Sequence, residues 1–191
     1  DEMLADALVT AVDLAAHAVD RDVVAVIEID AEEIVPIPQL APGTAAGPMT
    51  GRGQRRRLRP AVFLDRDGTL TPEIGHVGDP RRIRLLPGVP AALRMLRRSG
   101  YLLVCVTNQS GVARGLTRRD EVNAVNTEVE RRLAGRGVPI AGWLICPHHP
   151  EGRVKEYAVA CRCRKPGTLL HRRALRRHGL SAARSAVVGD K

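Results

Sequence analysis

The stretch AVFLDRDGTL, residues 61 to 70, places Asp65 and Asp67 one residue apart at the end of a short apolar run. Two carboxylates this close together at the end of a buried strand can form the reactive part of an active site. The same pair can instead end a strand in an ordinary turn, because Gly68 and Thr69 follow at once. The stretch by itself leaves both interpretations open.

Polar residues also follow three later apolar runs. The runs YLLVCV, GWLI and SAVV lead into TNQSG, CPHHP and GDK, respectively. In open parallel α/β sheets, ligands bind outside the carboxyl ends of the strands. Four strand ends that carry acidic, hydroxyl, amide and thiol groups therefore favour one shared site over four unrelated turns.

The elements that must position these residues alternate between strand and helix after residue 60. We predict strands over 61–64, 101–107, 142–146 and 185–190, and helices over 88–100, 118–137 and 168–179. The apolar runs do not alternate with polar residues, and helices separate them. This pattern predicts an α/β fold with a parallel sheet covered by helices on both faces.

The first part of the chain reads differently. Apolar residues at helical spacing predict a helix over 3–19, and DVVAVIEI predicts a strand over 22–29. Pro and Gly then interrupt every period, which indicates a linker. We therefore divide the chain into an N-terminal helix-strand segment of unknown origin over 1–34, a linker rich in Pro, Gly and Arg over 35–59, and a catalytic domain over 60–191.

Charge is also distributed unequally along the chain. Residues 1 to 50 carry ten acidic and one basic residue, a net charge of −9, whereas the remainder carries a net charge of +18. A basic surface attracts nucleic acids, acidic partners or phosphorylated metabolites. Charge does not choose among these three kinds of partner.

Four cysteines fall into two groups. Cys105 lies inside the apolar run YLLVCVT and is predicted to be a small core residue. Cys146, His148, Cys161 and Cys163 form Cys-x-His and Cys-x-Cys pairs, a Cys₃His set suited to tetrahedral structural zinc. The N-terminus lacks a secretory pattern, which favours metal over disulfides. From spacing alone, unligated thiols stay open as an alternative.

The motifs FLDRDGTL, GHVGDP, LLPGV, VTNQSGVARG, CPHHP, CRCRKPG and VVGDK together resemble the D-glycero-D-manno-heptose 1,7-bisphosphate 7-phosphatase family. This family belongs to the haloacid dehalogenase (HAD) phosphatase superfamily, and the resemblance covers residues 60 to 191. It implies a Rossmann-like HAD core with a zinc-binding loop and no large cap domain. Histidinol-phosphatase is the nearest alternative, although NQSGVARG and CPHHP are more similar to the heptose family.

The resemblance implies a role for each site residue. Asp65 would attack phosphorus, Asp67 would serve as general acid and base, and Thr107 and Lys165 would stabilise charge on the phosphoryl oxygens. Independently of the resemblance, Thr69 can form a hydrogen bond that holds the turn after the two aspartates. The implied substrate-binding residues are Glu73, Ile74, Gly75, His76, Asn108, Gln109, Ser110, Arg164 and Lys191. The implied Mg²⁺ ligands are Asp65, the backbone carbonyl of Asp67, and Asp190, and the implied Zn²⁺ ligands are Cys146, His148, Cys161 and Cys163.

Two departures from the family pattern stand out. CRKPGTLL lacks residues that the family has between Lys-Pro and Gly, and the chain stops at Lys191 where the family continues. We therefore expect a HAD domain that is incomplete at its C-terminus.

The sequence thus predicts a Mg²⁺-dependent phosphatase that hydrolyses the 7-phosphate of a heptose 1,7-bisphosphate in nucleotide-activated heptose biosynthesis. Histidinol phosphate hydrolysis, a zinc-containing nucleic-acid module and an inactive fragment are the alternatives. Aromatic content of 2% disfavours base stacking on nucleic acid. We expect a phosphorylated sugar as substrate, no nucleic-acid or membrane partner, a monomer, and a location in the cytoplasm.

Overall fold

The computed structural model describes residues 58–189, and the statements below concern that range. The helix and strand expected over 3–19 and 22–29 lie outside the described residues, as does the linker up to residue 57. Asp190 and Lys191 also lie outside them.

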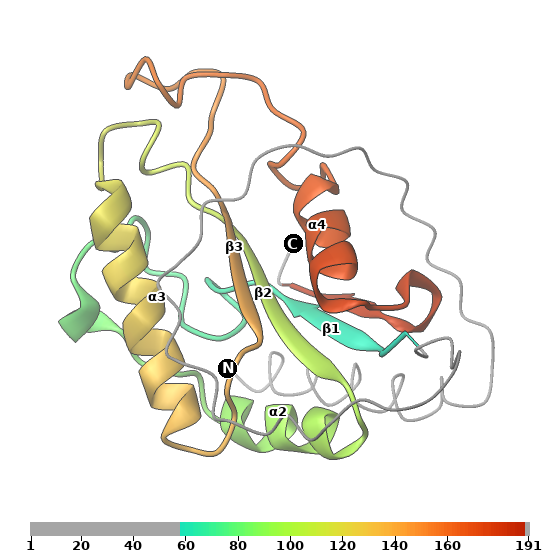
Figure 1. Ribbon diagram of the computed structural model, residues 1–191. Coiled ribbons are helices and arrows are strands. Elements are labelled where there is room, and N and C mark those ends of the chain that lie inside the picture. Colours follow the sequence, from blue (N-terminus) through green and yellow to red (C-terminus); the bar gives the residue numbers. More distant parts are fainter. Residues whose placement is uncertain (1–57, 190–191) are drawn as a thin grey trace, which may run out of the picture.

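A parallel sheet of four strands forms the centre of the fold (Figure 1). The strands are β1 (Ala61–Leu64), β2 (Leu102–Asn108), β3 (Gly142–Cys146) and β4 (Ala186–Val188). Their order is β3-β2-β1-β4, and every neighbouring pair is parallel. All four predicted strands and their parallel arrangement are confirmed.

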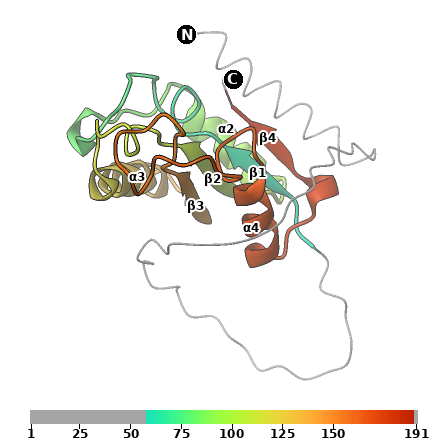
Figure 2. The same ribbon diagram turned by 90° about the horizontal axis from the view of Figure 1, so that it is seen from above.

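Side chains of β1 point alternately to the two faces of the sheet, and each face has its own apolar core. Val62 and Leu64 belong to a cluster that includes Leu93 of α2 and Val129 of α3. Phe63 of the same strand belongs to a second cluster. That cluster includes apolar residues of α4, so the prediction of helices on both faces is confirmed (Figure 2).

The helices are α2 (Val89–Arg98), α3 (Arg119–Ala134) and α4 (Leu169–His178), with short 3₁₀ helices η1 (Pro80–Arg82) and η2 (Ala182–Arg184). Gly88 precedes α2 with φ of 78°, and Gly179 ends α4 with φ of 60°. Both are left-handed conformations that glycine adopts without a steric penalty.

The segment just before β1 is attached to the end of α4. Arg59 N donates to Gly179 O at 3.2 Å, and Ser181 N donates to Arg59 O at 2.9 Å. Arg59, which the sequence assigned to the linker, thus pairs with the residues after α4. Between residues 58 and 189 the connections between strands contain no large inserted domain, and each helix there is too short or too polar to cross a bilayer.

Cys105 is fully buried, as predicted, and burial raises the pKa of its thiol. His171 of α4 is buried as well, with its ring 5.1 Å from the Phe63 ring in an edge-on contact. Neither of its ring nitrogens has a hydrogen-bond partner among the described residues. Burial is the main reason why the pKa of His171 falls from 6.5 to about 4.

This histidine predicts a pH-dependent stability. Because the unfolded chain takes up the proton below pH 6.5 and the folded chain resists it until about pH 4, stability is lost as the pH falls through that window. The penalty approaches about 3 kcal/mol at full protonation. His171→Phe should remove this contribution, so its Tm should fall less than that of the parent chain between pH 7 and pH 5. Equal decreases in Tm would contradict a buried neutral imidazole.

Candidate active site

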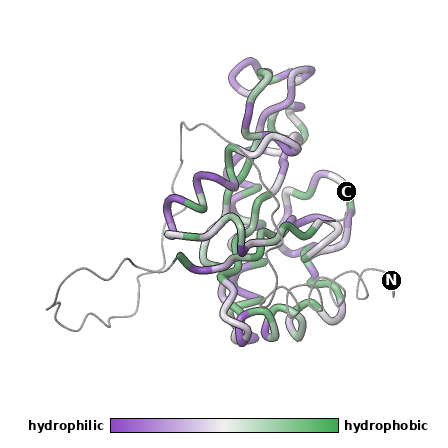
Figure 3. Tube along the Cα trace, turned by 90° about the vertical axis from the view of Figure 1, so that its right-hand side faces the viewer, coloured by the Kyte–Doolittle hydropathy of each residue, from purple (hydrophilic) through white to green (hydrophobic). Residues whose placement is uncertain are grey.

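The predicted site residues that fall within the described range gather at the carboxyl ends of the strands. Asp65 follows β1, Thr107 and Asn108 end β2, and Cys146 ends β3. Figure 1 shows the loops after β2 and β3 side by side beyond this edge of the sheet. Figure 3 shows mostly hydrophilic residues in the loop that projects there.

Asp65 is held at three points. Its backbone N–H donates to Val188 O of β4 at 2.9 Å, and its Oδ1 accepts from the Arg66 N–H at 2.7 Å. Its Oδ2 pairs with Lys165 Nζ, which comes from a position 100 residues further along the chain. The side chains of Asp65 and Lys165 are 19% and 22% exposed. The carboxylate is thus oriented by the protein and still accessible to a ligand.

Asp67 is held by a different set of donors. Arg66 donates through Nε to Oδ1 at 2.9 Å and through Nη2 to Oδ2 at 2.6 Å. Gln109 Nε2 donates to Oδ2 at 2.7 Å and to Thr107 Oγ1 at 3.0 Å. The two aspartates therefore have different side-chain donors. Lys165 pairs with Asp65, whereas Arg66 and Gln109 donate to Asp67.

The turn after the aspartates is organised by a backbone carbonyl. Arg66 O accepts from the amides of Leu70 at 2.8 Å and Thr71 at 3.0 Å, and Gly68 has φ of 74°. The Thr69 N–H donates to the same carbonyl at 3.3 Å and so helps to hold the turn, whereas its buried hydroxyl has no partner among the described residues. The Thr71 hydroxyl lies 3.4 Å from Arg66 O and contributes the side-chain contact instead.

Asn108 and Gln109 direct their side chains to protein groups. Asn108 Oδ1 accepts from the Lys165 N–H at 3.0 Å, and its Nδ2 donates to Lys165 O at 3.3 Å. These two bonds fix the backbone from which Lys165 reaches Asp65. Ser110, next in the loop, is partly buried.

The predicted substrate loop, residues 73–76, is exposed. Gly75 N donates to Glu73 Oε1 at 3.1 Å. A Cβ placed on Gly111 would lie 2.8 Å from His76 Nδ1, so this loop contacts the loop after β2. Arg164 is partly buried, and its Nη1 lies 3.5 Å from His148 O.

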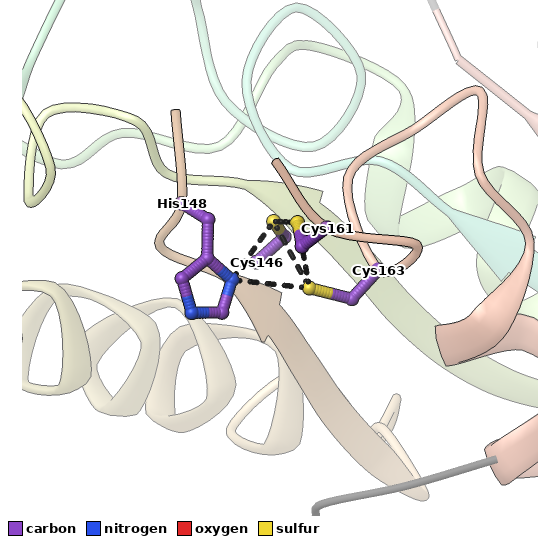
Figure 4. A group of neighbouring side chains, drawn as sticks. All are labelled: Cys146, His148, Cys161 and Cys163. Atoms are coloured by element: carbon purple, nitrogen blue, oxygen red, sulfur yellow. Dashed lines mark hydrogen bonds between the residues drawn. The ribbon is translucent and has the colours of Figure 1, made fainter. Parts of the chain in front are cut away.

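The four predicted zinc ligands come together in one cluster (Figure 4). Their ligand atoms, Sγ of Cys146, Cys161 and Cys163 and Nδ1 of His148, lie within 4.8 Å of one another. The Sγ atoms are 3.2 to 3.6 Å apart. Tetrahedral zinc with Zn–S bonds of about 2.3 Å holds its sulfurs about 3.8 Å apart. The donor set and its spacing fit one zinc ion after a small expansion.

Thiols this close influence each other's ionisation. The hydrogen bond between Cys146 and Cys163 is the largest cause that lowers the pKa of Cys163 to about 5, and it raises the pKa of Cys146. Burial is the main cause that raises the pKa of Cys161. A bound cation would favour the thiolate form of all three.

The loop that carries the cluster is joined to the loop after β2 by Ala113. Its carbonyl accepts from Arg153 N at 2.7 Å and from Val154 N at 2.9 Å, and its N–H donates to Pro147 O at 3.2 Å. The same loop continues to Lys165. The hydrogen bonds to Ala113 therefore help to place both the cluster and the lysine that pairs with Asp65.

The sequence did not single out Arg66, Asn126 or Ala113. Arg66 is fully buried, and its Nη1 donates to Asn126 Oδ1 of α3 at 2.9 Å. The position of Arg66 between two aspartates after a buried run was the available signal. Nothing in the sequence pointed to Asn126 or Ala113.

Similar proteins are known for about 70% of the chain. The chain is 42% identical over 134 residues to D-glycero-β-D-manno-heptose-1,7-bisphosphate 7-phosphatase of Yersinia pestis, covering 69% of this chain and 70% of the relative. It is also 42% identical over 132 residues to the protein of that name in Rhodopseudomonas palustris, covering 69% and 73%. No protein-family model matches the chain.

Two solved structures share the fold. A HAD-like phosphatase of Mesorhizobium loti superposes with a TM-score of 0.67 at 38% identity, over 75% of this chain and 68% of the other. The D,D-heptose 1,7-bisphosphate phosphatase of B. bronchiseptica, complexed with magnesium and phosphate, superposes with a TM-score of 0.60 at 33% identity. That match covers 69% of this chain and 70% of the other.

Proposed function

Since this chain belongs to the heptose 1,7-bisphosphate 7-phosphatase family of HAD-like phosphatases and is a phosphoric monoester hydrolase, we propose that it removes the 7-phosphate of D-glycero-D-manno-heptose 1,7-bisphosphate. The observation that carries this proposal is the pair of carboxylates after β1, with Lys165 on one of them. We assign the step to nucleotide-activated heptose biosynthesis.

Asp65 is proposed as the nucleophile. Its oriented and partly exposed carboxylate supports this role, because attack requires a fixed oxygen that substrate can reach. The P–O bond to the sugar breaks as an aspartyl phosphate forms on Asp65. Water then cleaves that intermediate and releases inorganic phosphate.

Asp67 is proposed as the general acid and base. It gives its proton to the leaving sugar oxygen in the first step and takes a proton from water in the second. Thr107 and Lys165 are proposed to stabilise the transferring phosphoryl group. Because Thr107 Oγ1 accepts from Gln109, its own hydroxyl hydrogen can be donated to a phosphate oxygen.

Two metals are proposed. Asp65 through its carboxylate and Asp67 through its backbone carbonyl would supply oxygen donors of the kind that Mg²⁺ prefers, together with Asp190 by resemblance. Mg²⁺ bound there would neutralise charge on the phosphate. Cys146, His148, Cys161 and Cys163 would hold Zn²⁺ as a structural ion, since four protein donors complete its coordination sphere.

Arg164 is proposed to contact the second phosphate, because its guanidinium can bind a phosphate through two N–H groups. Residues 73–76 and the loop Asn108–Ser110 are proposed to surround the sugar, with Lys191 as a further contact by resemblance. The side chains of Asn108 and Gln109 would act there by holding Lys165 and Asp67.

The division into residues 1–34, 35–59 and 60–191, the monomeric state and the cytoplasmic location stay predictions. The preference for heptose bisphosphate over nucleic acid is likewise a proposal. It is supported by the family relationship and by the carboxylate pair, which a zinc-containing nucleic-acid module would not require.

The substrate preference can be measured directly. We expect kcat/KM for heptose 1,7-bisphosphate to exceed the values for heptose 7-phosphate and histidinol phosphate by at least about tenfold, with activity only in the presence of Mg²⁺. Arg164→Gln should reduce the preference over the monophosphate, because the second phosphate loses a partner. Arg131→Gln, on the exposed side of α3, is the matched control and should leave both values unchanged. A larger kcat/KM for histidinol phosphate would establish the histidinol-phosphatase alternative.

A further inference from the structure

Arg66 is a charged side chain with no exposed surface. Burial of an unpaired guanidinium is costly, and such a group persists inside a protein when its nitrogens have hydrogen-bond partners. Here Nε and Nη2 donate to the two oxygens of Asp67, and Nη1 donates to Asn126 Oδ1. The partners of this arginine are therefore a proposed catalytic carboxylate on one side and helix α3 on the other.

The two-point contact fixes the plane of the Asp67 carboxylate. An arginine that donates to both oxygens prevents rotation about the bond that joins the carboxyl group to the side chain. Asn126 is itself 2% exposed and sits in the middle of α3, so the far end of the guanidinium cannot shift without disturbing that helix. The orientation of Asp67 is thus set in part from helix α3.

The contacts also distinguish the two oxygens of Asp67. A carboxylate offers about four acceptor positions, two on each oxygen. Oδ2 uses both of its positions, for Arg66 Nη2 at 2.6 Å and Gln109 Nε2 at 2.7 Å. Oδ1 uses one for Arg66 Nε at 2.9 Å, and its other position faces the Thr71 hydroxyl at 3.4 Å, whose single hydrogen is shared with Arg66 O at the same distance. Oδ1 is therefore the oxygen that is better able to accept the proton that the reaction transfers.

We propose that Arg66, anchored by Asn126, is a positioning residue that presents Oδ1 of Asp67 for both proton transfers of the phosphatase reaction. The inference rests on the function proposed above. In the first step the Oδ1–H proton passes to the sugar oxygen as its bond to phosphorus breaks. In the second step a water proton passes to Oδ1 as the water oxygen attacks phosphorus, which restores the starting acid.

A positioning role and a merely structural role predict different kinetics. Departure of a sugar alkoxide requires a proton, whereas departure of p-nitrophenolate requires little help because that anion is stable. The value of kcat/KM includes only the steps up to bond cleavage when that step is irreversible. A misplaced Asp67 should therefore lower kcat/KM for the sugar phosphate selectively, whereas general damage to the fold should lower both values alike.

The test compares Arg66→Met, Arg66→Lys and Asn126→Ala with the parent chain on heptose 1,7-bisphosphate and on p-nitrophenyl phosphate. We expect Arg66→Met to lose about 100-fold or more in kcat/KM on the sugar, the size of a general-acid contribution, and less than about fivefold on the aryl phosphate. Lysine keeps the charge but cannot donate to both oxygens in one plane, so Arg66→Lys should fall between Arg66→Met and the parent. Asn126→Ala should show the same selectivity at about tenfold.

Arg131→Met on the exposed side of α3 is the control for loss of an arginine, and it should behave as the parent chain. Equal losses on both substrates, or no loss in Arg66→Met, would overturn the inference. If Arg66→Met gives no cooperative melt, the test is made with Asn126→Ala instead. A larger loss of kcat/KM on the sugar phosphate than on the aryl phosphate supports the inference, and an unchanged ratio of the two kcat/KM values rejects it. A parent chain that hydrolyses neither substrate would instead refute the proposed function, so the two failures are distinguishable.

Discussion

Asp65→Asn is expected to abolish phosphate release while the protein stays folded. An amide cannot accept the phosphoryl group, and loss of a covalent nucleophile reduces turnover by at least about 10⁴-fold in enzymes of this kind of mechanism. The isosteric amide keeps its carbonyl oxygen as acceptor for the Arg66 N–H, but it loses the charge that faces Lys165. Phosphate release from the sugar bisphosphate measures the loss of turnover, and a thermal melt checks that the variant stays folded.

The mechanism also predicts a covalent signature. Parent protein quenched in acid during turnover should gain the mass of one phosphate, and Asp65→Asn should not. Asp120→Asn is the matched control, because Asp120 is an exposed aspartate at the start of α3, paired only with surface groups. Its activity should equal that of the parent. Comparable hydrolysis by Asp65→Asn and an active parent would rule out Asp65 as the nucleophile.

Cys163→Ser is expected to lose zinc and to destabilise the loop between β3 and α4. A ligand present at about 1,000 times its Kd contributes about 4 kcal/mol to folding stability. For a domain of this size that corresponds to a decrease in Tm of roughly 10 °C. Activity should fall as well, because Lys165 lies two residues after Cys163 and its backbone is placed by the same loop.

Elemental analysis of protein purified without chelator should give one zinc per chain for the parent and none for Cys163→Ser. Cys105→Ala provides the comparison for loss of a thiol, since Cys105 is a core residue outside the cluster. It should retain full zinc content. Absence of zinc from the parent, with Cys146, Cys161 and Cys163 all reactive toward a thiol reagent, would disprove the zinc assignment.

The sequence predicted the sheet and the three helices of the described residues well, because local signals define them. Apolar runs such as VFL and LVCV are typical of buried strands. In the structure Gly88 and Gly179 lie at helix boundaries. The short helices η1 and η2 were not predicted, since three residues carry no periodicity.

The contacts within the site were harder to predict than its members. Asn108 and Gln109 were predicted to bind substrate, and nothing in the sequence indicated that their side chains also bind Lys165 and Asp67, which lie 57 and 42 residues away along the chain. Arg66 reads in the sequence as one of many basic residues, and only tertiary packing against Asn126 reveals that it is buried. Motif spacing identifies which residue types meet at a sheet edge, but not which of them bind each other.

Gly152 limits which sequence changes the loop between Cys146 and Cys161 can tolerate. A Cβ at this position would lie 2.7 Å from Ala113 O, closer than real Cβ atoms approach other atoms, and 3.0 Å from His149 O, closer than most do. Any side chain at position 152 would therefore push the two loops apart and break the bonds from Arg153 and Val154 to Ala113. By contrast, positions 155–156 and 159–160 are exposed. Insertions and deletions between Cys146 and Cys161 should therefore accumulate in the outer stretch 155–160, while glycine is retained at position 152.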